Sequence, residues 1–252
     1  MEDSRRVVMA LLGFSILSAL GAACSSLGGG GVSGKAQPEP DPERARRIHM
    51  VASQIEARDV KDKAVLEAMR TVPRHLFVPV SERARTYIDD PLPIGFGQTI
   101  SQPYIVGLMT SLIRPTRSMK VLEVGTGSGY QAAVLAECVS QVYSIEIVPG
   151  LGQRAKELLD ELEYRNVHTR IGDGYDGWPD AAPFDGIVVT AAPDKVPQPL
   201  LDQLAVGGRL VIPVGRGRQD LLLITRTEEG FDRQEVIPVR FVPMTGKARE
   251  EK

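Results

Sequence analysis

Hydrophobic positions after residue 120 follow two alternating patterns. Short apolar runs of the kind that form buried strands lie at 120–124, 142–146, 167–171, 184–190 and 208–213. The segments between them show helical spacing, at 130–139, 150–163 and about 197–204. Strands that alternate with helices form a parallel sheet covered on both faces. The pattern therefore predicts a doubly wound α/β fold.

Two further strands close the predicted sheet. Residues 221–227 and 236–242 are separated by the turn Glu228-Glu-Gly230, which favours an antiparallel pair. With the five earlier strands they predict a mostly parallel, seven-stranded, Rossmann-like sheet.

The part before residue 115 predicts an N-terminal helical extension of three helices. The first begins at Asp41 and Pro42, an N-cap residue followed by proline. The second covers about 61–71, and the third covers 101–113, with Ser101 at or near its N-cap. Inward-facing positions are expected at Ile48, Val51, Ile55, Val65, Ala68, Met69, Val106, Met109 and Leu112.

The first 41 residues have a different composition. Arg5 and Arg6 precede an apolar run at 7–23, and the small residues before Cys24 follow. Residues 1–24 therefore resemble a secretory signal peptide or a lipoprotein signal. The Gly-, Ser- and Pro-rich residues 25–41 are typical of a flexible linker. The folded domain is expected at 42–246, with a helical substrate-site region at 42–115 and an α/β core at 116–246.

Charge and metal-binding residue types exclude several functions. The 252 residues have a formal net charge of -2, and the basic residues are scattered, so no nucleic-acid partner is expected. Two cysteines make neither a disulfide framework nor a metal site. The three histidines have no metal-ligand spacing, and His75 is expected to be structural. No metal is predicted.

A glycine-rich loop follows the first strand of the predicted core. The segment 121–130 reads VLEVGTGSGY, which is a strand, a tight turn and a helix start. Glycines let the backbone approach a ligand closely, and a helix start attracts polar ligand groups. Glu146 ends the next strand, about 20 residues later, where an acidic residue can bind ribose hydroxyls. The pattern predicts a nucleotide-like ligand.

The spacing G-x-G-x-G with Glu146 resembles class I S-adenosylmethionine (SAM) methyltransferases. Other segments extend the resemblance in order over about residues 45–245. They lie at 72–79, 91–98, 98–103, 172–174, 183–193, 207–215 and 239–243. Together they resemble the protein-L-isoaspartate (D-aspartate) O-methyltransferase family, and 98–103 (QTISQP) is the segment most specific to it.

The resemblance implies a site on the loops at the strand ends. The glycine loop admits the methionine part of SAM, Glu146 holds the ribose, and Asp173 contacts the adenine. Alternative roles are a solvated strand end for Glu146, an Asp-Gly turn for Asp173 and helix capping for Ser101. The cofactor-binding residues are expected to be Glu123, Gly125, Thr126, Gly127, Ser128, Gly129, Glu146, Asp173 and Gly174. The substrate-binding residues are expected to be Asp89, Thr99, Ile100, Ser101 and Thr190, with Ser101 as the catalytic residue.

The family reaction is methyl esterification of the free α-carboxylate of L-isoaspartyl and D-aspartyl residues in damaged proteins. It initiates repair through a succinimide. A carboxylate with a pKa around 4 is already ionised, so no strong base is needed. Ser101 has no base beside it that would make it a nucleophile, which favours a role in orienting the carboxylate.

Two alternatives stay open. The first is a SAM methyltransferase for another acceptor, against which the segment 98–103 argues. The second is a membrane-tethered, inactive SAM-fold protein that binds damaged polypeptides. The family resemblance and the supply of SAM imply a cytoplasmic location, whereas residues 1–24 suggest export or an anchor of the periplasmic lipoprotein kind. The protein is expected to be a monomer.

Overall fold

The computed structural model describes residues 41–249, which belong to one compact unit. The expectations for the signal-like segment 1–24 and for nearly all of the linker at 25–41 lie outside the described residues. None of the helices in 41–249 combines the length and the apolar character that crossing a bilayer requires.

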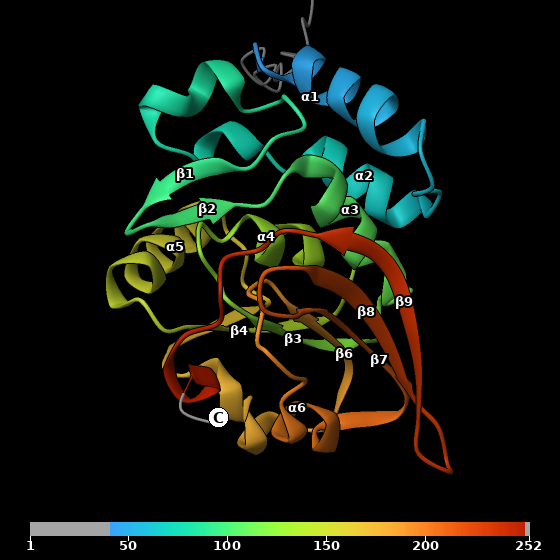
Figure 1. Ribbon diagram of the computed structural model, residues 1–252. Helices are drawn as coiled ribbons and strands as arrows, with labels where there is room; N and C mark the ends of the chain where they lie inside the picture. The colour runs from blue at the N-terminus through green and yellow to red at the C-terminus, as the bar shows by residue number, and fades with distance from the viewer. Residues whose placement is uncertain (1–40, 250–252) are drawn as a thin grey trace, which may run out of the picture. The chain divides into compact units, whose positions relative to one another are not determined.

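A seven-stranded sheet forms the centre of the fold (Figure 1). Its order is β5-β4-β3-β6-β7-β8-β9. Strands β3 to β7 run parallel, and β8 is antiparallel to both β7 and β9. This confirms the predicted fold class. The strands are β3 (Lys120–Val124), β4 (Gln141–Glu146), β5 (Val167–Ile171), β6 (Phe184–Val189), β7 (Leu204–Val214), β8 (Gln219–Arg226) and β9 (Phe231–Val239).

Each face of the sheet packs against its own helical layer. Side chains alternate between the faces of a strand, so Val121 joins one apolar cluster, whereas Leu122 and Val124 join the other. In Figure 1, α4 (Tyr130–Ala136) and α5 (Pro149–Glu161) cover the upper face. The short helix α6 (Gln198–Asp202) covers the lower face.

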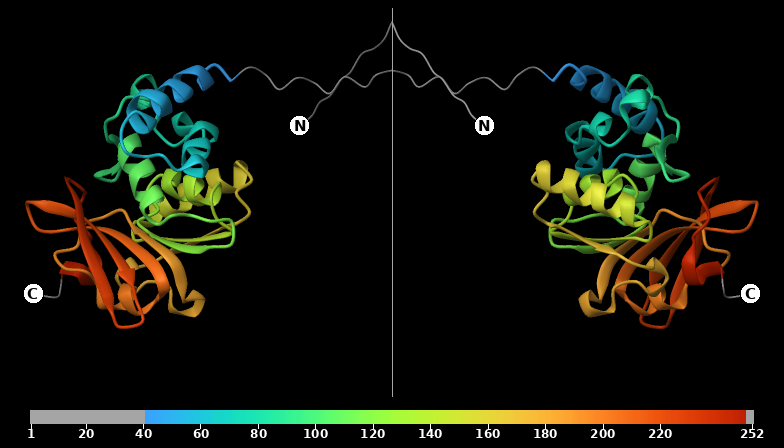
Figure 2. Two further views of the ribbon diagram at one scale, coloured as in Figure 1. Left: turned by 90° about the vertical axis from the view of Figure 1, so that its right-hand side faces the viewer. Right: turned by 90° about the vertical axis from the view of Figure 1, so that its left-hand side faces the viewer.

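Helices of the N-terminal part form a further layer beyond α4 and α5, and both views in Figure 2 show it in blue to green. These are α1 (Arg44–Met50), which continues into the π-helical segment η1 (Val51–Glu56), then α2 (Lys63–Thr71) and α3 (Pro103–Leu112). Short 3₁₀ segments, η2 (Arg74–Leu76) and η3 (Val80–Arg85), connect α2 to β1. Most of the expected inward positions are buried, namely Val51, Ile55, Val65, Ala68, Met69, Val106 and Met109.

The starts of the first two helices differ from the prediction by two residues. Helix α1 begins at Arg44, because Asp41 forms a turn in which its side chain accepts a hydrogen bond from the Glu43 N–H. Helix α2 begins at Lys63, where Asp62 is the N-cap and its carboxylate accepts hydrogen bonds from two backbone N–H groups.

Helix α3 begins at Pro103, and Ser101 does not cap it. A proline disfavours helical backbone in the residue before it, and Gln102 is accordingly extended, with φ -58° and ψ 147°. The N–H of Tyr104, in the first turn, donates instead to Asp89 Oδ1 at 2.8 Å. The capping role that was the alternative for Ser101 is therefore performed by Asp89, from a different loop.

A small hairpin was not predicted. Strands β1 (Leu92–Gly95) and β2 (Gln98–Ile100) pair antiparallel. The turn residues Phe96 and Gly97 have φ of 54° and 71°. The Phe96 ring lies against Gly150 at the start of α5, and Arg154 of α5 donates to the carbonyl oxygen of Ile94. Contacts with α5 therefore hold the hairpin in place.

Candidate active site

A cavity lies at the carboxyl ends of β3, β4 and β6, where ligands bind in open α/β sheets. It is walled by the end of β2, the glycine loop and the chain at 242–245. Most of the predicted site residues line it, namely Thr99, Ile100, Ser101, Gly125, Thr126, Gly127, Ser128, Glu146, Asp173, Gly174 and Thr190. Three do not, namely Asp89, Glu123 and Gly129.

The glycine loop needs glycine at its first position. Gly125 has φ +99°, and a Cβ there would lie 2.3 Å from Thr190 Oγ1. The Thr190 hydroxyl donates to the carbonyl oxygen of Gly125 at 2.6 Å. The end of β6 thus fixes the loop after β3, and both residues line the cavity.

Glu146 presents a preoriented carboxylate. Its Oε2 accepts a hydrogen bond from the Gly127 N–H at 2.7 Å, and its Oε1 accepts one from the Val148 N–H at 2.8 Å. A carboxylate has about four acceptor positions, so each oxygen keeps one for a ligand. A pair of neighbouring hydroxyl groups, as in a ribose, matches this arrangement.

Glu123 lies beneath the loop rather than in the cavity wall. It is fully buried, the Ser144 hydroxyl donates to its Oε2, and Thr126 Oγ1 lies 2.5 Å from Ser144 Oγ. Its Oε1 has no hydrogen-bond partner among the described residues. Burial, with the charge of Glu146, raises the pKa of Glu123 to about 8.

Asp173 is both a turn residue and a cavity residue. Its Oδ1 accepts from the Tyr175 N–H at 2.9 Å, as expected for an Asp-Gly turn, and its Oδ2 accepts from the Lys247 N–H at 2.8 Å. A Cβ on the next residue, Gly174, would lie 2.4 Å from Val124 Cγ1. The turn therefore packs closely against β3.

A second cavity adjoins the first. The two share Thr99, Ser101, Thr190 and Val242 as lining residues. The rest of the second cavity is lined by Arg58, by Pro91, by residues around Tyr104 and by the chain at 237–241. Ser101 and Thr190 therefore mark where a ligand in one cavity would meet a ligand in the other.

The two cavities differ in charge. Among the described residues, the charged side chains that line the first are Glu146 and Asp173, without any Lys, Arg or His. Those that line the second are Arg58 and Arg240, without any Asp or Glu. The first cavity thus suits a cationic ligand and the second an anionic one.

Asp89 and Gly129 have structural positions. Asp89 lies outside both cavities, where it accepts from the Tyr104 N–H and pairs with Arg58 at 3.1 Å. Gly129 has φ +88° and starts α4, with Ala155 and Leu159 of α5 at 3.4 Å from a Cβ there. Asp89 contacts the start of α3 and Gly129 begins α4, and both helices carry residues that line a cavity.

Sequence reasoning missed one wall of the site. The chain at 242–245 and the residues Ile147 and Ala191 line the first cavity. The segment 239–243 contributed to the family resemblance, but nothing in its composition indicates a ligand. His75 lies outside both cavities, with Nδ1 2.7 Å from the Tyr87 hydroxyl. Within 41–249, no three His, Cys, Asp or Glu side chains form a group that could hold a metal ion.

The sheet order, the glycine loop after the first parallel strand and the acid ending the next one define a class I SAM-dependent methyltransferase. Residues 45–249 match the family model described as protein-L-isoaspartate (D-aspartate) O-methyltransferase. The chain belongs to this family.

Curated relatives agree over most of their length. Protein-L-isoaspartate O-methyltransferase of Gloeobacter violaceus is 56% identical over 204 residues, which are 80% of this chain and 100% of that protein. The enzyme of that name from Opitutus terrae is 58% identical over 81% of this chain and 89% of its own.

Solved structures agree with the fold. A protein-L-isoaspartate O-methyltransferase matches with a TM-score of 0.73 and 29% identity, over 81% of this chain and 67% of its own. A putative one from Plasmodium falciparum, in complex with S-adenosyl-L-homocysteine, matches with a TM-score of 0.68 and 24% identity, over 79% and 98%.

Proposed function

We propose that this chain uses SAM to methylate the free α-carboxylate of L-isoaspartyl and D-aspartyl residues in damaged proteins. Family membership supports the reaction. The structural observation that carries the proposal is the pair of joined cavities of opposite charge. The acid-lined cavity suits a sulfonium donor, the arginine-lined cavity suits a carboxylate acceptor, and the two meet at Ser101 and Thr190.

The residues of the first cavity fit SAM. The glycine loop lines the cavity from Gly125 to Ser128, where it would admit the methionine part. The Glu146 carboxylate would hold the ribose hydroxyls, and Asp173 with Gly174 would contact the adenine. When bound, SAM supplies an electrophilic methyl group on a positively charged sulfur.

The residues of the second cavity orient the acceptor. Among 41–249, the Ser101 hydroxyl makes no hydrogen bond to another residue, and no histidine lines either cavity. An ionised carboxylate needs no base, so Ser101 acts as a donor that aligns it. The rate gain comes mainly from proximity and alignment. The following backbone nitrogen then displaces methanol from the ester, and hydrolysis of the succinimide returns some normal aspartate.

The roles of the two cavities also support the expected division of the domain into a substrate-site region and a SAM-binding core. Residues 42–115 contribute Thr99 and Ser101 to the acceptor side, and 116–246 contribute the glycine loop and Glu146. The chain at 237–242 also lines the acceptor cavity, so the core supplies part of that site.

One assay tests the function. The protein is incubated with methyl-labelled SAM and with matched isoaspartyl and aspartyl peptides of one sequence. We expect base-labile label on the isoaspartyl peptide alone. Label on another acceptor class would point to a different methyltransferase. Bound SAM without label on any peptide would rule out the enzyme and favour a binding protein.

We also propose that residues 1–24 direct export or membrane anchoring of a monomeric enzyme. The support is the sequence pattern, and the family match begins only at residue 45. Mass spectrometry of the native amino terminus tests the proposal. A mature chain that begins at Cys24 with added lipid mass would support anchoring, whereas an intact terminus in a cytoplasmic fraction would contradict it.

A further inference from the structure

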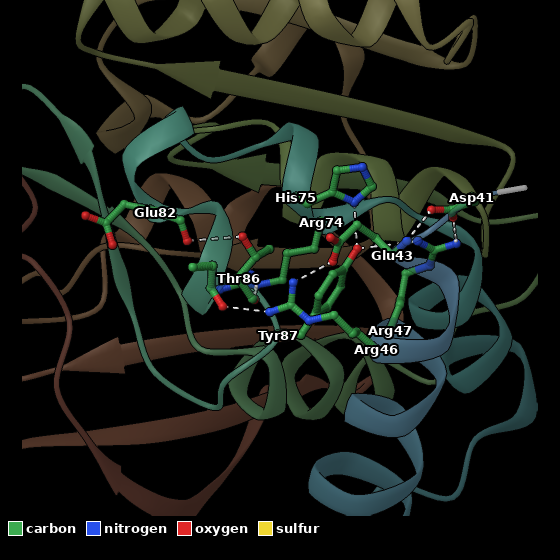
Figure 3. A network of polar contacts seen from close by, with 10 residues as sticks. Asp41, Glu43, Arg46, Arg47, Arg74, His75, Glu82, Thr86 and Tyr87 are labelled. Atoms are coloured by element: carbon green, nitrogen blue, oxygen red, sulfur yellow. Dashed lines mark hydrogen bonds and ion pairs between the residues drawn. The ribbon is translucent and has the colours of Figure 1, made fainter.

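The segment 72–79 contains a charged residue that the reaction described above does not use. Arg74 is fully buried, as is the Tyr130 ring that lies 4.8 Å from its guanidinium carbon. It forms no ion pair with a carboxylate of the described residues, and its Nη1 has no hydrogen-bond partner there. Figure 3 shows it inside a polar network, with the carboxylate of Asp41 paired to Arg47 instead.

Arg74 binds two backbone carbonyl groups that are distant in sequence. Its Nε donates to the carbonyl oxygen of Thr86 at 2.9 Å, and its Nη2 donates to that of Ser101 at 2.8 Å. The planar guanidinium holds both oxygens in a fixed relation, which a lysine ammonium does not do. The residue thus ties the backbone of Ser101 to the interior of the N-terminal helical layer.

Burial of this charge is costly. A buried cation without an ionic partner loses the stabilising hydration of its charge, and burial lowers the pKa of Arg74 to about 10. The group still carries its proton at neutral pH. The buried guanidinium thus spends its donors on two backbone carbonyl oxygens, where its planar geometry fixes their relative position.

Ser101 lies in the short link between β2 and α3. Among 41–249 its carbonyl oxygen accepts only from Arg74, and its hydroxyl makes no hydrogen bond. We propose that Arg74 is a positioning residue for methyl transfer, which fixes the Ser101 backbone so that its hydroxyl meets the acceptor carboxylate. This assignment rests on the acceptor site proposed above.

The test uses the full-length protein and the isoaspartyl peptide assay, with turnover expressed per SAM site titrated. Arg74→Lys keeps the charge but not the planar guanidinium that donates to two carbonyl oxygens, and Arg74→Gln removes the charge. We expect kcat to fall roughly 10-fold in the first variant and up to about 100-fold in the second, since small misplacements cost that much. The Kd for SAM should change less than about 3-fold, because the main SAM contacts stay in place.

A double-mutant cycle separates positioning from stability. If Arg74 acts through Ser101, the variant with both Arg74→Lys and Ser101→Ala should be no slower than Ser101→Ala alone, within about 3-fold. Arg47→Lys is the matched control. Arg47 is also buried and donates to a backbone carbonyl oxygen, that of Arg70 at 2.6 Å, but its hydrogen-bond partners do not include Ser101. It should lower the melting temperature and leave kcat unchanged.

Several outcomes would overturn the proposal. They are unchanged kcat in both Arg74 variants, additive losses in the cycle, an equal loss of SAM affinity, or a similar loss of kcat in the control. Failure of both Arg74 variants to fold at 10 °C, a temperature chosen to favour the folded state, would also do so, because the residue would then have no separable effect on transfer. An inactive wild type would instead contradict the proposed function itself.

Discussion

At the scale of single residues, buried polar side chains help to hold the loops of the site in place. Glu123 illustrates this, since it lies under the glycine loop and reaches Thr126 through Ser144. Its carboxyl group has one unpaired oxygen and a pKa raised to about 8. At neutral pH the folded protein therefore holds most of this group in its neutral, protonated form.

The raised pKa gives a stability that depends on pH. An unfolded glutamate has a pKa of about 4.3, so between that pH and 8 the folded state binds more protons than the unfolded state. This contribution is complete below pH 4.3 and is lost as pH rises through 8. Relative to Glu123→Gln, the wild type should lose up to about 1.4 kcal/mol per pH unit between pH 5 and 8.

Urea unfolding of the SAM-free proteins at pH 5.5, 6.5 and 7.5 measures this slope. Glu157→Gln, at an exposed position on α5, is the control and should follow the wild type. A constant difference between wild type and Glu123→Gln across this range would mean that Glu123 has an ordinary pKa in the folded protein.

The geometry argues against helix capping by Ser101 and favours its proposed role in orienting the acceptor carboxylate. Since it does not cap α3, Ser101→Ala should leave the melting temperature within about 2 °C, as expected for a change below 0.5 kcal/mol. It should lower kcat roughly 10-fold or more, because an aligning hydrogen bond is lost. The Kd for SAM, measured by calorimetry, should stay the same. Equal losses in kcat and SAM affinity would refute the orienting role.

At the scale of secondary-structure elements, the β1–β2 hairpin and α3 of the N-terminal part complete the site. The β1–β2 hairpin brings Thr99 and Ile100 to the cavity, and α3 begins two residues after Ser101. The Asp89 carboxylate connects α3 with Arg58, because it accepts from the first turn of the helix and pairs with Arg58 at the acceptor cavity. The expected substrate role of Asp89 therefore becomes an indirect one.

Asp89→Ala should destabilise the protein by about 1–2 kcal/mol, the usual effect of losing a helix cap. It should also raise the KM for the isoaspartyl peptide without changing the Kd for SAM. The neighbouring Asp90 has an exposed side chain and only a 3.9 Å contact with Arg85, so Asp90→Ala should cost less than about 0.5 kcal/mol. Chemical denaturation with peptide kinetics measures both; equal effects of the two variants would exclude the capping role.

Local patterns predicted the core elements well and the connections poorly. The strand before Gly125 and the acid at Glu146 are visible in sequence because periodicity and glycine spacing are local properties. The hairpin at 92–100 has two very short strands, interrupted by Pro93, and depends on contacts with α5. The chain at 242–245 reaches the cavity only through the order of the C-terminal strands. No local pattern encodes such contacts.

At the scale of the whole molecule, the N-terminal helical layer and the C-terminal strands meet over the acceptor cavity. Arg58 comes from the chain after η1, and Arg240 follows β9, the edge strand of the sheet. Residues about 180 positions apart thus give the acceptor cavity its positive charge, while the acid-lined donor cavity belongs mainly to the parallel strands. In this arrangement the positive sulfonium donor and the negative carboxylate acceptor bind in separate cavities, and methyl transfer between them neutralises both charges.

Arg240 provides the sharpest test of this charge separation. It is exposed, and among 41–249 it forms no ion pair, whereas Arg58 is already paired with Asp89. Arg240→Gln should raise the KM for an isoaspartyl peptide about 2- to 5-fold, the size expected for an exposed charge interaction. The Kd for SAM should not change, because Arg240 does not line the donor cavity.

Arg233→Gln is the matched control, because Arg233 is exposed on β9, the strand that precedes Arg240, but lines neither cavity. The difference in KM between Arg240→Gln and the wild type should shrink as salt rises from 0.05 to 0.5 M, since screening shortens the reach of exposed charges. A KM that rises equally in the two variants, or that is independent of salt, would show that net charge or shape determines acceptor binding. A rise confined to Arg240→Gln at low salt would instead place the acceptor carboxylate near Arg240, in the cavity that adjoins the acid-lined donor cavity.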